Sequence, residues 1–345
     1  MSNLHLVQFR TPQEFLQAVE AHDDAFLNWS VGSLLESTDQ VQIKMRKLKG
    51  IPKILLAVYE NDALILVMIK VAEDIACSLA APRDTIVELS GTEMAAAVSL
   101  LVTHVASIVD PKIFDKIMAP DDLGDLFIKQ WIAQMETRGL RFEPLPHPFE
   151  MKVSYATLAT IPPPPPIPLQ YELELPTHGD VEVLAQFFVD FARHGPREVS
   201  LEEARDKMRM HVDQGDIWVC KVDGEIAGFC VTGRSTAKTI AIRNVYVSPR
   251  HRRKGIADSM TRILTRYLLG ATPLGSVGGP AASSPKSVKL EVVLNVAQDF
   301  VERIYKNCGF LLGTDDKDPV SGKKGWQALV FRGVRLLESE SAAAA

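Results

Sequence analysis

A run of prolines near the middle of the chain constrains the fold more than any other feature of the sequence. Residues 161–168 read Ile-Pro-Pro-Pro-Pro-Pro-Ile-Pro. Proline has no backbone N–H and favours an extended helix, so this run cannot lie inside a β-sheet. We interpret the run as a semi-rigid linker between two domains, and a ligand for an SH3 or WW domain is the alternative.

The length of the chain agrees with two domains. At roughly 100–200 residues for each domain, 345 residues are enough for two separate cores. We therefore expect an N-terminal domain over residues 1–160, the linker at 161–168, a second domain over 169–335 and a tail at 336–345.

Composition and charge exclude several classes of protein. Hydrophobic residues make up 46% of the chain and charged residues 23%, which is typical of a globular protein. The net charge of −5 gives no general affinity for nucleic acid or an anionic membrane. The start has no secretory signal pattern, and the longest apolar stretch, residues 95–109, is too short to span a bilayer. We expect a cytoplasmic protein without a disulfide framework or a metal site, because its cysteines lie far apart: Cys77, Cys220, Cys230 and Cys308.

The second half of the chain has a regular pattern of strands and helices. Asp223-Gly224 between two apolar runs predicts a β-hairpin. Ser200 and Glu203 form a capping box, which predicts the start of a helix. Strands are expected at 169–175, 217–222, 225–231, 239–247, 287–294, 310–313 and 326–331, and helices at 180–194, 201–214, 252–269 and 299–307.

The first half repeats this order less clearly. Its hairpin turn at Asn61 precedes the Asp223-Gly224 turn by about 163 residues. Similar elements in a similar order indicate a duplicated fold. Strands are expected at 5–9, 54–59, 63–70, 85–89 and 149–155, and helices from 12 to about 35, at 93–109 and at 121–137.

A basic turn in the second half carries the clearest chemical signal. The segment 244–257 reads as a strand, a turn rich in arginine and lysine, and the start of a helix. A helix N-terminus presents backbone N–H groups and a positive dipole end, and Gly255 lets a phosphate approach the backbone. The pattern therefore predicts an anion site, and a solvated basic turn is the alternative.

This pattern resembles the acyl-CoA signature of the GNAT superfamily of N-acyltransferases. Arg252-x-x-Gly255-x-Ala257 follows a strand, as in that superfamily, and the order of elements is similar as well. The segment 294–310, with Tyr305 and Gly309-Phe310, is similar to a second block of the superfamily. The resemblance implies an α/β (α+β) fold with two GNAT-like mixed-sheet domains, of which the N-terminal one is degenerate.

The resemblance also implies how acyl-CoA is bound. The backbone of the strand before the turn would pair with pantetheine, the turn would hold the pyrophosphate, and Asn295 and Gln298 would lie beside pantetheine. Relatives often have Asn at the position of Gln298. The implied residues are Val245, Tyr246, Val247, Arg252, Arg253, Lys254, Gly255, Ile256, Ala257, Asn295 and Gln298.

The catalytic residues are implied less completely. Tyr305 would protonate the leaving thiolate, and an ordinary packed aromatic is the alternative for it. Some relatives have a glutamate base in the strand that precedes the signature, but residues 240–244 contain no carboxylate. We expect Glu291 to be the base, with His194, Asp190 or a water chain as alternatives.

The implied activity is transfer of an acetyl group from acetyl-CoA to a primary amine by direct attack. We expect acetyl-CoA or another acyl-CoA as co-substrate, no metal, and a small-molecule amine rather than a protein as acceptor. We expect no nucleic-acid or membrane partner, and a monomer or homodimer. A non-catalytic module that binds CoA or a partner is the alternative. The N-terminal half, with acidic Glu93 at its corresponding helix start, is expected to bind no CoA.

Overall fold

The computed structural model describes residues 3–38, 54–71, 76–88, 91–146, 149–164, 171–193, 198–271 and 287–337. The chain forms two units. Unit 1 contains residues 1–152 and 327–345, and unit 2 contains residues 153–326. This division differs from the expected boundaries at 160 and 335. The proline run begins inside unit 2 rather than between the units, and the last strand of the chain belongs to unit 1.

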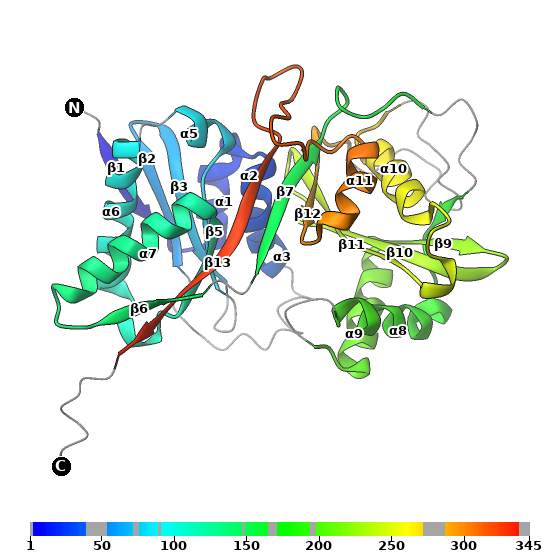
Figure 1. Ribbon diagram of the computed structural model, residues 1–345, viewed down its shortest axis with the longest axis horizontal. Helices are drawn as coiled ribbons and strands as arrows, with labels where there is room; N and C mark the ends of the chain where they lie inside the picture. The colour runs from blue at the N-terminus through cyan, green and yellow to red at the C-terminus, as the bar shows by residue number, and fades with distance from the viewer. Residues whose placement is uncertain are drawn as a thin grey trace, which may run out of the picture. The chain divides into compact units, whose positions relative to one another are not determined.

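Unit 1 is a mixed sheet with helices on both of its faces (Figure 1). Its sheet has the order β1-β2-β3-β4-β5-β13, and β6 pairs with β13 at the end. Neighbours from β1 to β4 are antiparallel, β4 and β5 are parallel, and β5 and β13 are antiparallel. The strands are β1 (Leu4–Gln8), β2 (Ile54–Glu60), β3 (Ala63–Lys70), β4 (Cys77–Ala80), β5 (Lys116–Pro120), β6 (Phe142–Leu145) and β13 (Trp326–Leu336).

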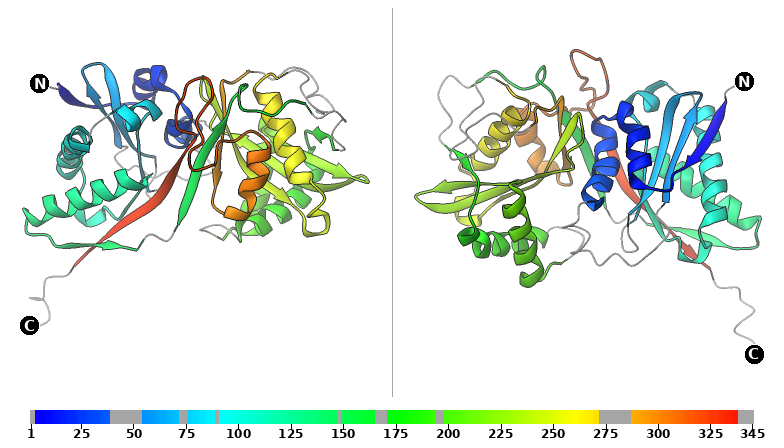
Figure 2. Two further views of the ribbon diagram at one scale, coloured as in Figure 1. Left: turned by 45° about the horizontal axis from the view of Figure 1, so that its top comes forward. Right: turned by 180° about the vertical axis from the view of Figure 1, so that it is seen from behind.

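The helices of unit 1 lie in two groups. The group that comes after β1 covers one face, and α6 and α7 cover the other (Figure 2). The α6/α7 face holds a large apolar cluster with Trp131 and Phe127 at its centre. The helices are α1 (Pro12–Val19), α2 (Ala25–Leu27), α3 (Ser33–Thr38), α5 (Arg83–Glu88), α6 (Gly91–Ile108) and α7 (Asp121–Glu136), and a π-helix (Asn28–Gly32) joins α2 to α3.

Helix α6 is a core helix of unit 1. It is the one helix among the described residues that is long and apolar enough, by length and composition, to cross a membrane. However, Val98, Leu101 and Val105 are fully buried and pack into the same cluster as Trp131. An apolar helix of this kind is explained by its burial against the sheet.

The last strand of the chain is held in unit 1 by ion pairs as well as by backbone pairing. The guanidinium of Arg332 donates to Asp121 and Asp125 on α7, and that of Arg335 donates to Glu143 on β6. Leu329, Val330 and Val334 of β13 are buried. Unit 1 thus obtains its sixth strand from the far end of the chain.

Unit 2 has the same strand order as unit 1. Its sheet runs β8-β9-β10-β11-β12-β7, and β11 and β12 are its parallel pair. Its last position is filled by the end of β7, which begins in unit 1. The strands are β7 (Glu150–Ala156), β8 (Leu173–Glu174), β9 (Ile217–Val222), β10 (Glu225–Gly233), β11 (Thr239–Val247) and β12 (Glu291–Val296), and the helices are α8 (Val181–Ala192), α9 (Leu201–Gln214), α10 (Ile256–Leu268) and α11 (Asp299–Asn307).

Local signals explain several boundaries in unit 2. The Ser200 hydroxyl accepts a hydrogen bond from the Glu203 N–H, and the Glu203 carboxylate accepts one from the Ser200 N–H, which confirms the capping box. Asp223 and Gly224 both have positive φ, as a two-residue hairpin turn requires. The predicted hairpin and the predicted α9 are therefore confirmed.

The two faces of the unit 2 sheet carry different helices (Figure 1). Helices α8 and α9 pack with Ile217, Val219 and Phe229 on one face. Helices α10 and α11 pack with Val292 and Leu294 on the other. The two-residue alternation of side chains in each strand produces these two separate cores.

Two predicted strands are wrong, and one predicted helix begins later than expected. Residues 85–89 were expected as a strand, but α5 occupies Arg83–Glu88 and the fourth strand of unit 1 is β4, Cys77–Ala80. Pro82 precedes the first turn of α5, where a missing N–H costs nothing, and the Thr85 hydroxyl donates to the Leu64 carbonyl. Residues 310–313 form no strand, and α10 begins at Ile256 rather than at residue 252.

Candidate functional site

The parallel strands of unit 2 part at their carboxyl ends. Their register pairs Thr239 with Glu291 and ends with Ile242 opposite Leu294. Strand β11 continues to Val247, and β12 continues to Val296. Beyond the last pair, the strands present backbone N–H and C=O groups that a ligand with amide groups can use.

Asn295 lies where the strands part. Its side-chain Oδ1 atom is buried and has no hydrogen-bond partner. A buried acceptor without a partner costs roughly 1–3 kcal/mol, so this atom favours a ligand that brings an N–H group. Gln298, the residue before α11, is exposed, and its side chain does not cap the helix.

Side chains on the parted end of β11 point to alternate faces. Val245 and Val247 pack with the α10/α11 core, whereas Tyr246 belongs to the α8/α9 core. The predicted trio Val245, Tyr246 and Val247 therefore offers backbone groups to the opening between the strands. The Tyr246 side chain serves the opposite face.

The basic turn leads directly from β11 into α10. A 3₁₀ turn (Pro249–His251) comes after the strand, and Arg253 and Gly255 then both adopt positive φ, at 63° and 77°. Positive φ is unusual for arginine and marks backbone strain of a kind that collects at functional sites. Gly255 immediately precedes α10, whose N-terminus carries no side-chain cap.

The start of α10 consequently has the features of an anion site. The first N–H groups of a helix, here from Ile256 and Ala257 onward, have no partner within the helix. A Cβ atom built on Gly255 meets no atom within 4 Å, so the space above the turn is open. The positive end of the helix dipole adds to this preference for an anion.

The basic side chains of the turn differ in their contacts. Arg252 Nε donates to the Val247 carbonyl at 3.1 Å, and its guanidinium carbon lies 5.9 Å from the centre of the Tyr246 ring. Arg250 forms an ion pair with Glu225 at 3.7 Å. Arg253 and Lys254 are exposed. Arg252 thus fastens the turn to the strand, while Arg253 and Lys254 supply charge toward solvent.

Tyr305 lies on α11, on the α10/α11 face. It is partly buried against that core, and its ring meets Phe310 edge-on with the ring centres 6.2 Å apart. Burial raises the pKa of the Tyr305 phenol well above its usual value near 10, with Cys230 and Cys308 adding to the shift. Its phenol is therefore protonated at neutral pH, as a proton donor must be.

The structure separates Glu291 from the other predicted residues. Glu291 is the first residue of β12 and pairs with Thr239, at the closed end of the parallel pair. Asn295 lies four positions later, which is about 13 Å along a strand. His194 lies outside the described residues.

Asp190 is a carboxylate that contacts the parted strand. Its Oδ2 atom accepts a hydrogen bond from the Tyr246 hydroxyl at 3.4 Å, and its Oδ1 atom pairs with Arg193 at 3.0 Å. The sequence predicts roles for both Asp190 and Tyr246 but not their contact. The alternation of side chains in β11, which places Tyr246 on the face opposite Val245 and Val247, is the signal that could have indicated it.

Unit 1 differs at the corresponding place. In its parallel pair, β4 and β5, the strand β4 leads into α5 rather than into a basic turn. The Arg83 N–H, near the end of β4, donates to the Asp24 carboxylate at 2.7 Å. A carboxylate thus occupies the Arg83 N–H near this strand end, and Glu93 lies in the first turn of α6.

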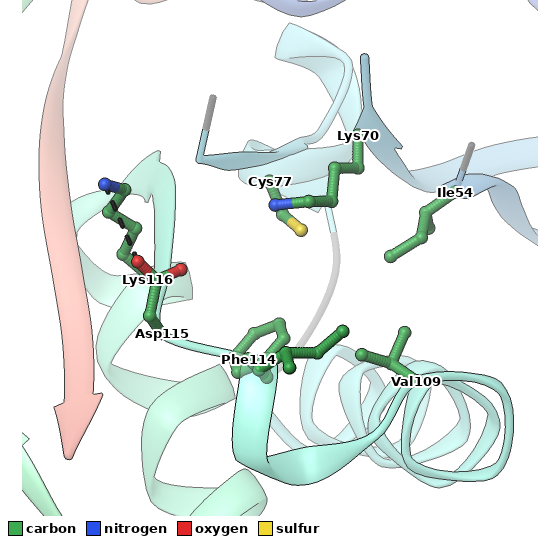
Figure 3. A pocket seen from close by; sticks show the side chains of 8 residues that line it. Ile54, Lys70, Cys77, Val109, Phe114, Asp115 and Lys116 are labelled. Atoms are coloured by element: carbon green, nitrogen blue, oxygen red, sulfur yellow. Dashed lines mark ion pairs between the residues drawn. The ribbon is translucent and has the colours of Figure 1, made fainter. Parts of the chain in front are cut away.

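Unit 1 also has a recess (Figure 3). This recess lies at the amino-terminal ends of its parallel strands, whereas the candidate site of unit 2 lies at the carboxyl ends. The recess encloses about 350 Å³, including space open to solvent, and is lined by the first residues of β2, β4 and β5. Burial raises the pKa of the Cys77 thiol there to about 11, so the thiol is unreactive. In the part of the chain that the structure describes, no group of three or more His, Cys, Asp or Glu residues comes together to hold a metal ion.

Comparison with known proteins identifies part of unit 2. Residues 213–310 match the family model of the acetyltransferase (GNAT) domain. No curated protein matches the chain. Residues 213–310 include β9 to β12, the basic turn, α10 and α11.

Three solved structures illustrate the likeness. A GCN5-related N-acetyltransferase from Sphaerobacter thermophilus has 14% identity and a TM-score of 0.45, over 97% of this chain and 96% of that chain. A tandem GNAT protein from the clavulanic acid biosynthesis pathway has 14% identity and a TM-score of 0.45, over 98% and 100%. A putative acetyltransferase from Salmonella typhimurium, solved with acetyl-CoA, has 18% identity and a TM-score of 0.32, over 50% and 96%. With such scores these likenesses carry no argument about activity.

The family match and the geometry of unit 2 agree. The matched segment contains the parted strands, the left-handed Gly255 and the uncapped start of α10. Residues 213–310 therefore match the sequence model of a GNAT acetyltransferase domain, which confirms for this segment the resemblance seen in Arg252-x-x-Gly255-x-Ala257.

Proposed function

We propose that this protein is an acyl-CoA-dependent N-acyltransferase that moves an acetyl group from acetyl-CoA to a primary amine. The observation that carries the proposal is the uncapped start of α10 beside two parallel strands that part. The first feature suits a pyrophosphate and the second suits an amide-bearing arm. The match of residues 213–310 to the GNAT domain supports the same combination.

The residues present fit acyl-CoA. The backbone N–H groups from Arg253 to Ala257 would hold the pyrophosphate, with Arg253 and Lys254 adding charge. The backbone of Val245 and Val247 would pair with the pantetheine arm. Asn295 Oδ1, a buried acceptor without a partner, would receive an amide N–H from that arm. Gln298 lies at the exposed end of the same path.

The reaction requires little beyond positioning and two proton transfers. The bound thioester supplies an activated acetyl group. The amine nitrogen forms a C–N bond to the acetyl carbon, the C–S bond breaks, and the nitrogen gives up a proton. Tyr305, held in its protonated form by burial, would donate a proton to the leaving sulfur and then regain one from solvent.

A small-molecule amine is the proposed acceptor. Direct attack needs the amine and the thioester together, which favours a ternary complex over a covalent enzyme intermediate. The four cysteines are buried. Burial also raises the pKa of the Cys308 thiol far above its usual range, which removes this thiol, in the α10/α11 core, as an acyl carrier.

Thiol release by the full chain tests this function. Purified protein is incubated with acetyl-CoA and a panel of amines, and free thiol and acetylated products are measured together. Stoichiometric release of thiol with one class of amine is expected. The residues 240–244 contain no carboxylate, so a non-catalytic CoA-binding role is the second candidate. Tight acetyl-CoA binding by calorimetry, without product from any amine, would establish that second role instead.

A further inference from the structure

Two tyrosines flank the opening in the unit 2 sheet from opposite faces. Tyr305 packs with the α10/α11 core, and Tyr246 packs with the α8/α9 core. The candidate acyl-CoA site includes the start of α10, on the first of these faces. If acyl-CoA lies on the first face, an amine that reaches the thioester through the parted strands would come from the second face, where Tyr246 lies.

We propose that the Tyr246 hydroxyl and the Asp190 carboxylate together take the proton from the acceptor amine. This inference rests on the proposed function and supplies a base in place of the carboxylate that residues 240–244 lack. Tyr246 would contact the amine and act as the catalytic residue. Asp190 would act through it, as a positioning residue and as the final proton acceptor.

Aromatic neighbours hold the Tyr246 ring in place, and the Tyr246 hydroxyl donates a hydrogen bond to Asp190. The ring centre lies 5.3 Å from that of Phe187 and 5.8 Å from that of Phe229. Only 5% of Tyr246 is exposed, whereas 32% of the Asp190 side chain is exposed. The pair thus links a buried hydroxyl to a carboxylate that can pass a proton to water.

The direction of the hydrogen bond sets the roles. Burial raises the pKa of Tyr246, and the neighbouring Asp190 charge raises it further, while Arg252 opposes the shift. The hydroxyl therefore stays protonated and donates to Asp190 Oδ2. Arg252 also lowers the pKa through a hydrogen bond to the Tyr246 oxygen, and the other lone pair of that oxygen would accept an N–H from the amine.

The proton transfers balance. An ammonium acceptor first releases one proton to solvent and becomes the neutral amine. As its nitrogen forms the C–N bond, that nitrogen passes a second proton to the Tyr246 oxygen while the Tyr246 proton moves to Asp190. Asp190 then releases it to water. The C–S bond breaks and its electron pair stays on sulfur, which takes a proton from Tyr305.

Two cations influence this pair. Arg193, three residues after Asp190 on the chain, binds Asp190 Oδ1 at 3.0 Å and leaves Oδ2 to Tyr246. Arg252 lies 5.9 Å from the Tyr246 ring.

The experiment uses the full chain and the amine that gives the highest thiol release. Asp190→Asn and Tyr246→Phe are compared with Asp206→Asn. Asp206 is a matched control, because it pairs with Arg209 on α9 through the same atoms, with the same spacing and at the same 3.0 Å. Acetyl-CoA affinity is measured by calorimetry, and kcat is measured from about pH 5 to 9.

We expect Asp190→Asn and Tyr246→Phe each to lower kcat about 100-fold or more, since a lost general base typically costs 10²–10⁴-fold. Acetyl-CoA affinity should change less than about twofold, and Asp190→Glu should restore part of the rate. The low-pH limb of the wild-type profile should disappear in Asp190→Asn and persist in Asp206→Asn.

Two results would overturn the inference while leaving the proposed function intact. One is an Asp190→Asn enzyme as active as Asp206→Asn. The other is an unchanged low-pH limb in a slowed Asp190→Asn enzyme, which indicates a merely structural role. Failure of the proposed function itself has a different signature, because wild-type protein then acetylates no amine, whether or not it binds acetyl-CoA.

Discussion

The two units share one strand order and differ in the segment after the fourth strand. Both place a parallel pair after three antiparallel strands and complete the sheet with a sixth strand. After β11, unit 2 has a basic turn and an uncapped helix start at Gly255. After β4, unit 1 has α5, and its Arg83 N–H is bound by Asp24.

This difference separates the requirements of folding from those of binding. Runs of buried apolar residues, as in β3 and β10, build the sheet in both units. An anion site requires additional residues, namely glycine where the backbone has positive φ, and free N–H groups with nearby cations. We infer that unit 1 keeps the first set of residues and lacks the second, so it is expected to bind no CoA.

The largest expected effect concerns the strand that unit 1 receives from the end of the chain. A chain that stops after Trp326 lacks β13, which removes Leu329, Val330 and Val334 from the core. Each buried side chain contributes about 1.5–3 kcal/mol, and a domain has only about 5–15 kcal/mol of stability in total. Unit 1 should therefore fail to fold, as seen by limited proteolysis and by loss of helical circular dichroism.

A chain that stops after Leu337 is the control for this truncation and should unfold like the full chain. If the chain that stops after Trp326 keeps a protease-resistant unit 1, then β13 is dispensable, and the two units do not share a need for the strand that follows their parallel pair.

The second effect tests which unit holds acyl-CoA. Gly255→Glu places a carboxylate and a Cβ at a residue with φ of 77°, at the proposed pyrophosphate position. Acetyl-CoA affinity should fall at least about 100-fold, since both charge repulsion and backbone strain oppose binding. Gly91→Glu at the start of α6, where a Cβ meets no atom within 4 Å, should leave the affinity unchanged in calorimetry. The reverse ranking of the two variants would assign the site to unit 1.

The third effect separates binding from turnover. Tyr305→Phe removes only the hydroxyl, so turnover should fall about 10- to 100-fold while acetyl-CoA affinity stays within about twofold. Tyr59→Phe in unit 1, where burial also raises the pKa of the phenol, should change neither quantity. Normal thiol release by Tyr305→Phe would return Tyr305 to the role of a packed aromatic residue.

The smallest effect concerns the strained arginine of the turn. Arg253→Gly relieves about 1 kcal/mol of strain at φ of 63°, against about 0.5–1 kcal/mol of added chain entropy in the unfolded state. The midpoint of thermal unfolding should hardly move, while acetyl-CoA affinity should fall several-fold with the lost charge. Asn61→Gly, at the positive-φ hairpin turn of unit 1, is the control and should leave affinity unchanged. Equal affinities in both variants would show that Arg253 contributes no charge to binding.

Much of the fold could be predicted because its signals are local. The bounds predicted for β11, 239–247, and for α11, 299–307, agree with those of the structure, Thr239–Val247 and Asp299–Asn307. The strand predicted at 85–89 was wrong. Its β-branched residues favour a strand, but Pro82 before them is typical of a helix start, and the segment forms α5. The short strand β5 was missed because Lys116 and Pro120 obscure its pattern.

The candidate site could be predicted in part. The Arg252-x-x-Gly255-x-Ala257 pattern located the turn because backbone approach to a phosphate demands glycine at a fixed position. Glu291 was chosen from its strand alone, and register then placed it at the closed end of the parallel pair. The contact between Asp190 and Tyr246 spans 56 positions, and no local pattern encodes such a contact.

The sequence by itself determined the mixed α/β character of the chain, the hairpins, the capped helices and the basic turn, because each depends on neighbouring residues. Only the tertiary structure decided which strand completes which sheet, since β13 and the end of β7 are assigned by burial and by long-range pairing. It also decided which side chains share a face at the parted strands. Strand register and packing bring Tyr246 to Asp190 and keep Glu291 away, and both are properties of the folded chain.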